Sequence, residues 1–160
     1  MYLKNDLVMA IDISANGNQV IGIIGGFEHI LKRKEFLRKT SWIKHYREIS
    51  AREKHIYIVL FPRRFKKIES FLSVVKICRN IACANDVIGS VTPAVILIDD
   101  KLYNNFHNLA SVVIKESRIY YRHHRRLCLL ADNLANYFRI LLKRNPRRYL
   151  EELKRFEKII

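Results

Sequence analysis

The chain has 160 residues, 49% of them hydrophobic, and its 30 Lys and Arg against 15 Asp and Glu give a net charge of +15. This size and apolar content exclude a disordered tail and predict one domain with a packed core, spanning residues 1–160. The positive charge exceeds what solubility requires, so we expect a phosphate-rich partner. The alternatives are an anionic membrane surface and a merely soluble cationic face.

Export and membrane insertion are not expected from the sequence. No segment reaches the length of a membrane-spanning helix, and the N-terminus lacks the pattern of a signal peptide. We therefore expect a cytoplasmic protein that makes no membrane contact. Cys78, Cys83 and Cys128 are odd in number and lie in apolar stretches. They are predicted to be reduced core residues, neither a disulfide framework nor a zinc site.

Two strands are predicted at the N-terminus. Leu7–Ile13 is an apolar run that contains one acid, Asp12. Residues 14–18 carry Asn16-Gly17, a pair typical of tight turns. Residues 19–24 return as a second strand ending at Gly25-Gly26, so the first two strands form a hairpin.

The next segment, residues 28–54, is a basic insertion whose part 35–43 fits either a strand or a helical turn. Residues 55–61 are rich in β-branched and aromatic side chains and are predicted as a third strand. Pro62 then begins a helix over residues 63–84, where apolar residues recur at helical spacing.

In the C-terminal half we expect a strand over residues 91–98 and an amphipathic helix from Leu102 to Val113. A short fifth strand follows over residues 117–122. Residues 125–144 are a long helix with apolar residues around most of its circumference, and Pro146 begins a final charged helix to residue 160. This order predicts an α/β fold with a five-stranded mixed sheet and helices on both faces.

Three aspartates lie in or directly after the predicted strands and the long helix: Asp12, Asp99 and Asp132. A carboxylate at the end of an apolar strand is costly to desolvate unless a cation meets it, and a divalent metal is the usual cation for several carboxylates together. Simpler interpretations also fit these three positions. In them, Asp12 caps the turn that follows it, Asp99-Asp100 cap the next helix, and Asp132 belongs to a solvated polar stripe.

The residues around these acids resemble a known superfamily. The segments 11–17 and 20–25 are similar to the opening strands of an uncharacterised branch of the ribonuclease H-like superfamily, and 130–135 resembles that branch's closing Ala-Asp helix. Ile13 replaces the Glu that the branch usually has. The resemblance implies a ribonuclease H-like fold and metal-dependent hydrolysis of phosphodiester bonds, with Mg²⁺ or Mn²⁺ as cofactor.

Under this resemblance the catalytic metal ligands are Asp12, Asp99 and Asp132. Asp100 is an alternative to Asp99, and Glu69 is a possible further acid that is otherwise a surface residue. Basic residues around the site are expected to bind DNA or RNA: Lys32, Arg33, Lys34, Arg38, Lys39, Arg122, His123, His124, Arg125, Arg126, Arg139 and Lys143. A catalytically silent binding module of the same fold is the main alternative, and a small toxin-like ribonuclease is another.

His123 and His124 allow two further interpretations. Two adjacent histidines suit proton transfer or phosphate contact. A solvated basic turn is the interpretation that we favour, and a pair of histidines without Cys or a third ligand is weak support for zinc.

Overall fold

The centre of the protein is a five-stranded mixed sheet in the order β3-β2-β1-β4-β5. The computed structural model describes residues 6–14, 19–106 and 112–159. The strands are β1 (Leu7–Ser14), β2 (Val20–Phe27), β3 (Val74–Cys78), β4 (Val95–Ile98) and β5 (Val112–Lys115). The pairs β1–β2 and β2–β3 are antiparallel, whereas β4 and β5 run parallel to β1. The predicted α/β class and five-stranded mixed sheet are therefore confirmed.

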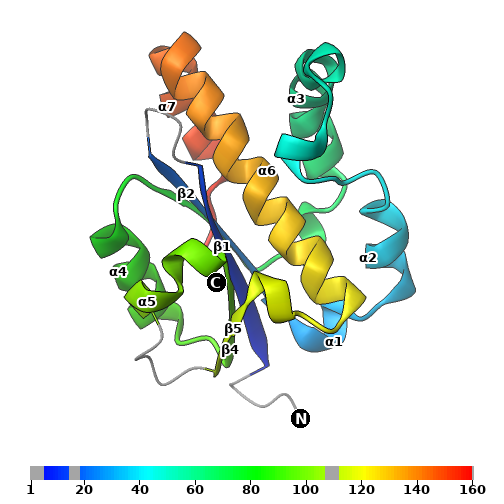
Figure 1. Ribbon diagram of the computed structural model, residues 1–160, viewed down its shortest axis with the longest axis vertical. Helices are drawn as coiled ribbons and strands as arrows, with labels where there is room; N and C mark the ends of the chain where they lie inside the picture. The colour runs from blue at the N-terminus through cyan, green and yellow to red at the C-terminus, as the bar shows by residue number, and fades with distance from the viewer. Residues whose placement is uncertain (1–5, 15–18, 107–111, 160) are drawn as a thin grey trace.

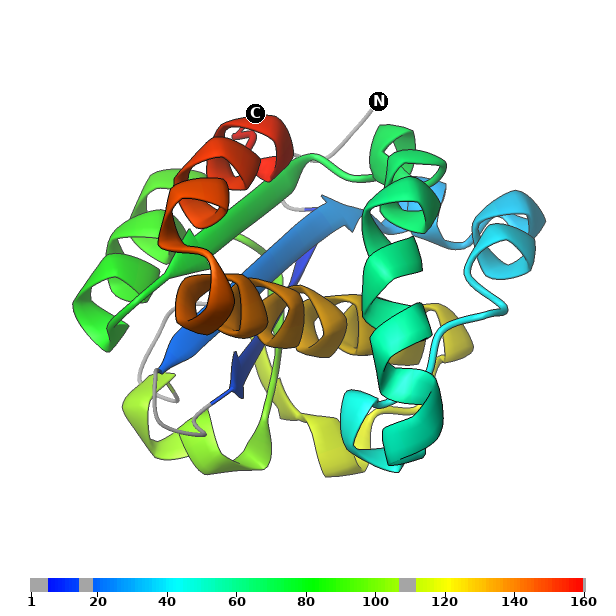
Figure 2. The same ribbon diagram turned by 90° about the horizontal axis from the view of Figure 1, so that it is seen from above.

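Helices cover both faces of this sheet (Figures 1 and 2). They are α1 (Glu28–Leu31), α2 (Lys34–Lys39), α3 (Ala51–Lys66), α4 (Ile81–Val91), α5 (Tyr103–Phe106), α6 (Arg122–Arg144) and α7 (Pro146–Phe156). Figure 1 shows α6 lying diagonally across the sheet, with α4 and α5 together on the side away from α3. The described part of the chain contains no helix that is both long and apolar enough to cross a membrane.

Strand alternation divides the core in two. Val8 and Ala10 of β1 pack in one cluster with residues of α6, α3 and α7. Met9 and Ile11 pack in the other cluster, with residues of α4 and α5. Successive side chains of a strand point to opposite faces, so Asp12 continues the row of Val8 and Ala10. Its carboxylate therefore emerges on the face that α6 covers.

Gly22 lets α6 lie directly on the sheet. Gly22 is the cross-strand partner of Asp12, and a Cβ atom at this position would lie 2.6 Å from the carbonyl oxygen of Ala131 and 3.0 Å from the amide nitrogen of Ala135. Those two residues flank Asp132 on α6. The missing side chain thus permits the close approach that brings Asp132 toward Asp12.

The third predicted strand is wrong, because residues 55–61 lie within helix α3. Ser50 caps that helix by accepting a hydrogen bond from the amide of Glu53. Tyr57, Phe61 and Phe65 recur every four residues and are all buried, so their packing outweighs the local strand propensity. The helix expected over residues 63–84 is also wrong: α3 ends at Lys66, and β3 and the start of α4 occupy the later part.

The last strand lies earlier than predicted. Residues 112–115 form β5, beside β4, whereas residues 116–118 form a 3₁₀ turn and Arg122 begins α6. Val113, expected in a helix, is therefore a strand residue. That helix is observed only as a 3₁₀ turn from Asp100 and as α5, and its expected part over residues 107–111 lies outside the described residues.

Several predictions with strong local signals are confirmed. The β1–β2 hairpin is present, although β2 continues through Gly25-Gly26 to Phe27; the predicted Asn16-Gly17 turn lies outside the described residues. The ambiguous stretch 35–43 begins with the helix α2. The long helix begins three residues before its predicted start, as α6, and Pro146 begins α7.

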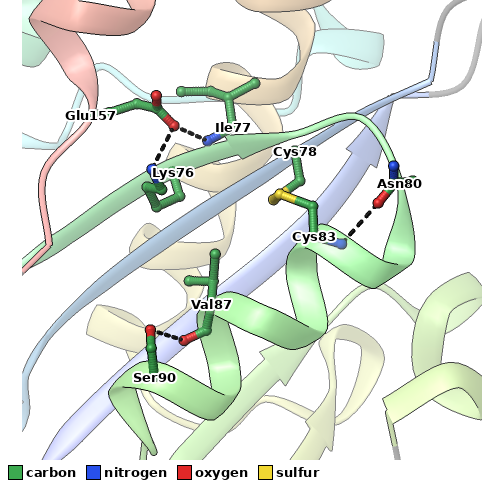
Figure 3. The surroundings of a disulfide bond; sticks show 8 residues. All are labelled: Lys76, Ile77, Cys78, Asn80, Cys83, Val87, Ser90 and Glu157. Carbon is green, nitrogen blue, oxygen red and sulfur yellow. Dashed lines mark hydrogen bonds and ion pairs between the residues drawn. A yellow bond between two sulfur atoms is a disulfide. The ribbon is translucent and has the colours of Figure 1, made fainter.

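The prediction that all three cysteines are reduced is wrong for two of them. Cys78 at the end of β3 and Cys83 in the first turn of α4 form a disulfide, with 5.7 Å between their Cα atoms (Figure 3). Asn80 between them caps α4 by accepting a hydrogen bond from the amide of Cys83. The bond and the cap together fix the β3–α4 corner. Cys128 is a free, buried thiol, as expected.

Candidate metal-binding site

Three acids form a row across the carboxyl ends of the parallel strands. The register pairs Ile11 of β1 with Ile98 of β4, and Ile98 with Lys115 of β5. The next residue along each chain is Asp12, Asp99 and Glu116, respectively. Adjacent parallel strands in register present equivalent residues on the same face. One carboxylate oxygen from each of these three acids lies within 4.8 Å of the others.

Burial and the neighbouring acids strongly perturb the ionisation of Asp12, a residue that is 5% exposed. Burial, a hydrogen bond shared with Asp99 and the charge of Asp132 all raise its pKa well above the ordinary range. Its Oδ1 accepts a hydrogen bond from the amide of Ile13 at 2.7 Å. Like charges at this distance disfavour joint ionisation, so the row favours either a proton or a cation.

Asp132 reaches the same pocket from α6. Its carboxylate accepts a hydrogen bond from the amide of Tyr46 at 2.9 Å and another from Asn136 Nδ2 at 3.3 Å. Burial raises its pKa, although the bond from Tyr46 acts in the opposite sense. The three predicted ligands Asp12, Asp99 and Asp132 thus line one pocket, and Glu116 joins them there.

His45 connects two of the acids. Its Nε2 lies 3.1 Å from Glu116, and its Nδ1 lies 3.9 Å from Asp132. The hydrogen bond with Glu116 raises the pKa of His45, and the charge of Asp132 adds to this effect. The acids around His45 therefore favour its protonated form.

A polar chain links β1 to α6 on the other side of the pocket. Arg139 Nε donates to Ser14 Oγ at 2.6 Å, and Ser14 donates to Asn136 Oδ1 at 3.0 Å. Asp132, Asn136 and Arg139, one stripe of the helix, all line the pocket, while Lys143 is exposed farther along. The stripe is therefore part of the site and not simply a solvated face.

The pocket has a volume of about 710 Å³, and its lining combines acids with cations. Five of the fifteen acidic residues of this basic chain line it: Asp12, Asp99, Asp100, Glu116 and Asp132. Arg47, Lys54, Lys101 and Arg139 line it as well. This arrangement suits a metal ion that is approached by an anionic ligand.

The structure separates Asp99 from its alternative Asp100 and from the further acid Glu69. Asp99 joins the row and also accepts a hydrogen bond from the amide of Lys101, so it caps the following 3₁₀ turn as well. Asp100 is exposed at the pocket rim, where it accepts from the amide of Ser117. Glu69 is not brought to the row: it precedes β3, whose first residue, Val74, pairs with Gly25 at the opposite end of the sheet.

The predicted nucleic-acid contacts fall into separate groups. Five on α2 and on the link between α1 and α2 are exposed: Lys32, Arg33, Lys34, Arg38 and Lys39. Around the start of α6, Arg122 and Arg125 are exposed, and Arg126 donates to the carbonyl of Leu37. His123 and His124 are buried in α6, which corrects the interpretation of this segment as a solvated turn.

Glu116 and His45 were not predicted. Glu116 directly follows an apolar strand, just as Asp99 does, so the same rule would have found it had the strand been placed at residues 112–115. His45 lies in an irregular segment between α2 and α3 and gives no comparable local signal.

No model of a known protein family matches the chain, and no curated protein matches it significantly. The fold and the site therefore define its class by themselves. It is an α/β protein with a five-stranded mixed sheet and an acidic pocket at the carboxyl ends of the parallel strands.

Proposed function

We propose that this protein is a metal-dependent nuclease with a ribonuclease H-like fold. The observation that carries the proposal is the aligned row of Asp12, Asp99 and Glu116, with Asp132 in the same pocket. Such a set of hard oxygen donors fits Mg²⁺ or Mn²⁺. When bound there, such ions would activate a water and stabilise the leaving oxygen of a phosphodiester.

The protein's own residues have complementary roles in this proposal. Asp12, Asp99, Glu116 and Asp132 would hold the ions. His45, which contacts Glu116, would donate its proton to the departing oxygen. Arg139, held by Ser14 and Asn136, binds a phosphate beside the scissile bond.

A basic groove next to the pocket supports a nucleic-acid substrate. Tyr46 and Lys54 line both the acidic pocket and a second one, of about 450 Å³, between α3 and α6. Arg144, Arg148 and His55 line that second pocket. A backbone that lay along this groove would place successive phosphates against cations and one phosphate at the acidic row.

The element order supports the ribonuclease H-like part of the proposal. After an antiparallel meander of three strands, two parallel strands follow through helical connections, and a long helix closes the fold. The additional α1, α2 and α3 precede β3, within and just after the basic insertion predicted over residues 28–54.

The test compares cleavage with binding. The wild-type protein is incubated with Mn²⁺ or Mg²⁺ and labelled single-stranded DNA, duplex DNA, RNA and an RNA–DNA hybrid, and affinity is measured by fluorescence anisotropy. We expect Asp12→Asn to abolish metal-dependent cleavage and to leave the affinity within about twofold. Asp86→Asn, at an exposed position on α4, is the matched control and should cleave normally.

The outcomes separate the two candidate functions. Tight, salt-dependent binding without cleavage of any substrate would replace the nuclease by a silent binding module. Replacing Lys54 or Arg144 by Ala should weaken binding and reduce the salt dependence by about one phosphate contact each. If neither binding nor cleavage occurs with any of the four substrates, the nucleic-acid proposal is wrong.

A further inference from the structure

A second cluster of metal-ligand side chains lies where α1 meets the start of α6. Glu28 is the first residue of α1, directly after β2, and His123 and His124 are the second and third residues of α6. Nε2 of His123 lies 2.5 Å from one carboxylate oxygen of Glu28, and Nε2 of His124 lies 2.8 Å from the other. In the sequence, His123 and His124 follow Glu28 by 95 and 96 positions, respectively.

The convergence of the two imidazoles is unusual for adjacent residues. Neighbouring positions on a helix point about 100° apart, since a turn takes 3.6 residues. Here the ring centroids lie only 4.4 Å apart, and Tyr121 packs against both rings. The histidine side chains are 9% and 7% exposed, so both rings are held in place by the fold.

A simple ion pair does not require this arrangement. One imidazolium suffices to pair with a carboxylate, whereas a second one this close would add repulsion between like charges. The two rings contact different carboxylate oxygens of Glu28, so the three side chains converge on one another.

We propose that Glu28, His123 and His124 bind a divalent transition-metal ion, and that Zn²⁺ fits best. Two histidines and a glutamate form a known zinc ligand set, with Zn–N distances of about 2.0–2.1 Å and Zn–O distances of about 2.0–2.2 Å. One ligand atom from each residue lies within 4.8 Å of the others. The ligand atoms around a tetrahedral zinc ion lie about 3.4 Å apart. Each imidazole–carboxylate N···O distance would therefore have to increase by less than about 1 Å to admit the ion.

Water would complete the coordination, and it can reach the cluster beside Glu28, the most exposed of the three side chains at 19%. The bound ion ties the β2–α1 junction to the start of the helix that carries Asp132. Its main effect is therefore structural, because binding to the native state alone stabilises the fold.

The two sites differ in chemistry and so in metal. The acidic row offers only carboxylate oxygens, which suit Mg²⁺ and Mn²⁺, whereas imidazole nitrogens favour Zn²⁺ and similar ions. The proposal is independent of nuclease activity, because it depends on the geometry of Glu28, His123 and His124 alone.

The test begins with wild-type protein freed of metal by a chelator and dialysis. Zn²⁺ is titrated by calorimetry in the presence of millimolar Mg²⁺, which is added to compete for the acidic row. We expect one equivalent of Zn²⁺ to bind and the midpoint of thermal unfolding to rise. Co²⁺ in its place should give the visible absorption bands of a tetrahedral site, and X-ray absorption of the zinc form should show imidazole scattering.

Variants assign the ion to these residues. His124→Gln and Glu28→Gln should each weaken Zn²⁺ affinity at least tenfold, with circular dichroism verifying that they fold. His55→Gln, at an exposed position on α3, and Asp12→Asn should bind Zn²⁺ as the wild type does. Because the spectroscopy uses the wild type, it decides the question even if a variant unfolds.

Three results would overturn the proposal. The first is no Zn²⁺ binding by folded wild-type protein, in which case the cluster is only a buried ion pair. The second is a carboxylate-only zinc shell without imidazole scattering. The third is loss of zinc in Asp12→Asn together with its retention in His124→Gln, which would place the ion at the acidic row.

Discussion

Replacing Asp12 by Asn should make the metal-free protein more stable, although it removes a central residue of the candidate site. Asp12 is buried, and its carboxyl lies beside those of Asp99 and Glu116. An Asn side chain has the same shape, keeps an oxygen to accept the hydrogen bond from the amide of Ile13, and can donate to Asp99. The variant therefore removes a charge without leaving a buried group unsatisfied.

Two calculations give similar values for the gain in the free energy of unfolding that Asp12→Asn should produce. At an effective dielectric constant of about 20, two ionised carboxylates whose oxygens lie within 4.8 Å of each other repel by at least about 3.5 kcal/mol. The alternative is that Asp12 binds a proton at pH 7. Protonating a carboxyl of ordinary pKa near 4 costs about 1.4 kcal/mol for each unit by which the pH exceeds that pKa, or roughly 4 kcal/mol at pH 7. Solvent in the open pocket reduces either value, so we expect a gain of about 1–3 kcal/mol.

The assay is thermal unfolding at pH 7 in a chelator. For 160 residues, 1 kcal/mol corresponds to about 3 °C, so Asp12→Asn should raise the midpoint by roughly 3–9 °C. Asp86→Asn should leave it within about 1 °C. Adding Mn²⁺ should stabilise the wild type and leave the variant nearly unaffected. An Asp12→Asn midpoint equal to or below that of the wild type in chelator would show that Asp12 bears no electrostatic strain.

Three further outcomes are expected. Because the native pKa of Asp12 is raised, the folded state keeps a proton that the unfolded state loses above about pH 4, so the stability of the metal-free protein should fall with rising pH. Thermal unfolding midpoints of the wild type measured from pH 5 to 9 should therefore diverge from those of Asp12→Asn. Parallel curves for the two proteins would contradict this. Gly22→Ala should destabilise the protein by about 1–3 kcal/mol through its clash with α6. Gly89→Ala, where an added Cβ would have no atom within 4 Å, should stabilise it by about 0.5–1 kcal/mol. Changes of the same sign in the free energy of denaturant unfolding for both variants would refute the packing argument. Reducing the Cys78–Cys83 disulfide should cost about 2 kcal/mol, the chain-entropy value for its short loop, and an unchanged melting curve in reductant would show that the bond contributes nothing.

The sequence predicted the elements whose local signals agree with their packing. The β1–β2 hairpin, α6 and α7 each have a clear apolar period together with a turn or a proline at the boundary. The segment 51–78 was mispredicted because its signals conflict. Its strand-forming residues follow a four-residue period, and Pro62 lies inside α3, where local rules would end the helix. Only the packing of Phe61 and Phe65 against α7 and α6 decides between the alternatives.

The candidate site was predictable where a single residue broke an apolar strand. Asp12 and Asp99 were found in this way, and Asp132 through the resemblance of its helix. Glu116 was missed because its strand was placed a few residues too late. The contact of Glu28 with His123 and His124 depends on how α6 lies against the β2–α1 junction, and no pattern within a short window encodes that.

The acidic row is best understood as a feature that folding by itself would not retain. The chain has two basic residues for every acidic one, so abundant cations are present to pair acids on the surface. Instead, Asp12 is buried among other acids, where neighbouring charge and desolvation both oppose its ionisation. Such an arrangement lowers stability unless a cation binds, because an unpaired buried charge is among the costliest features of a protein interior. The free energy lost in the metal-free state is the reason to expect that the row exists for a ligand.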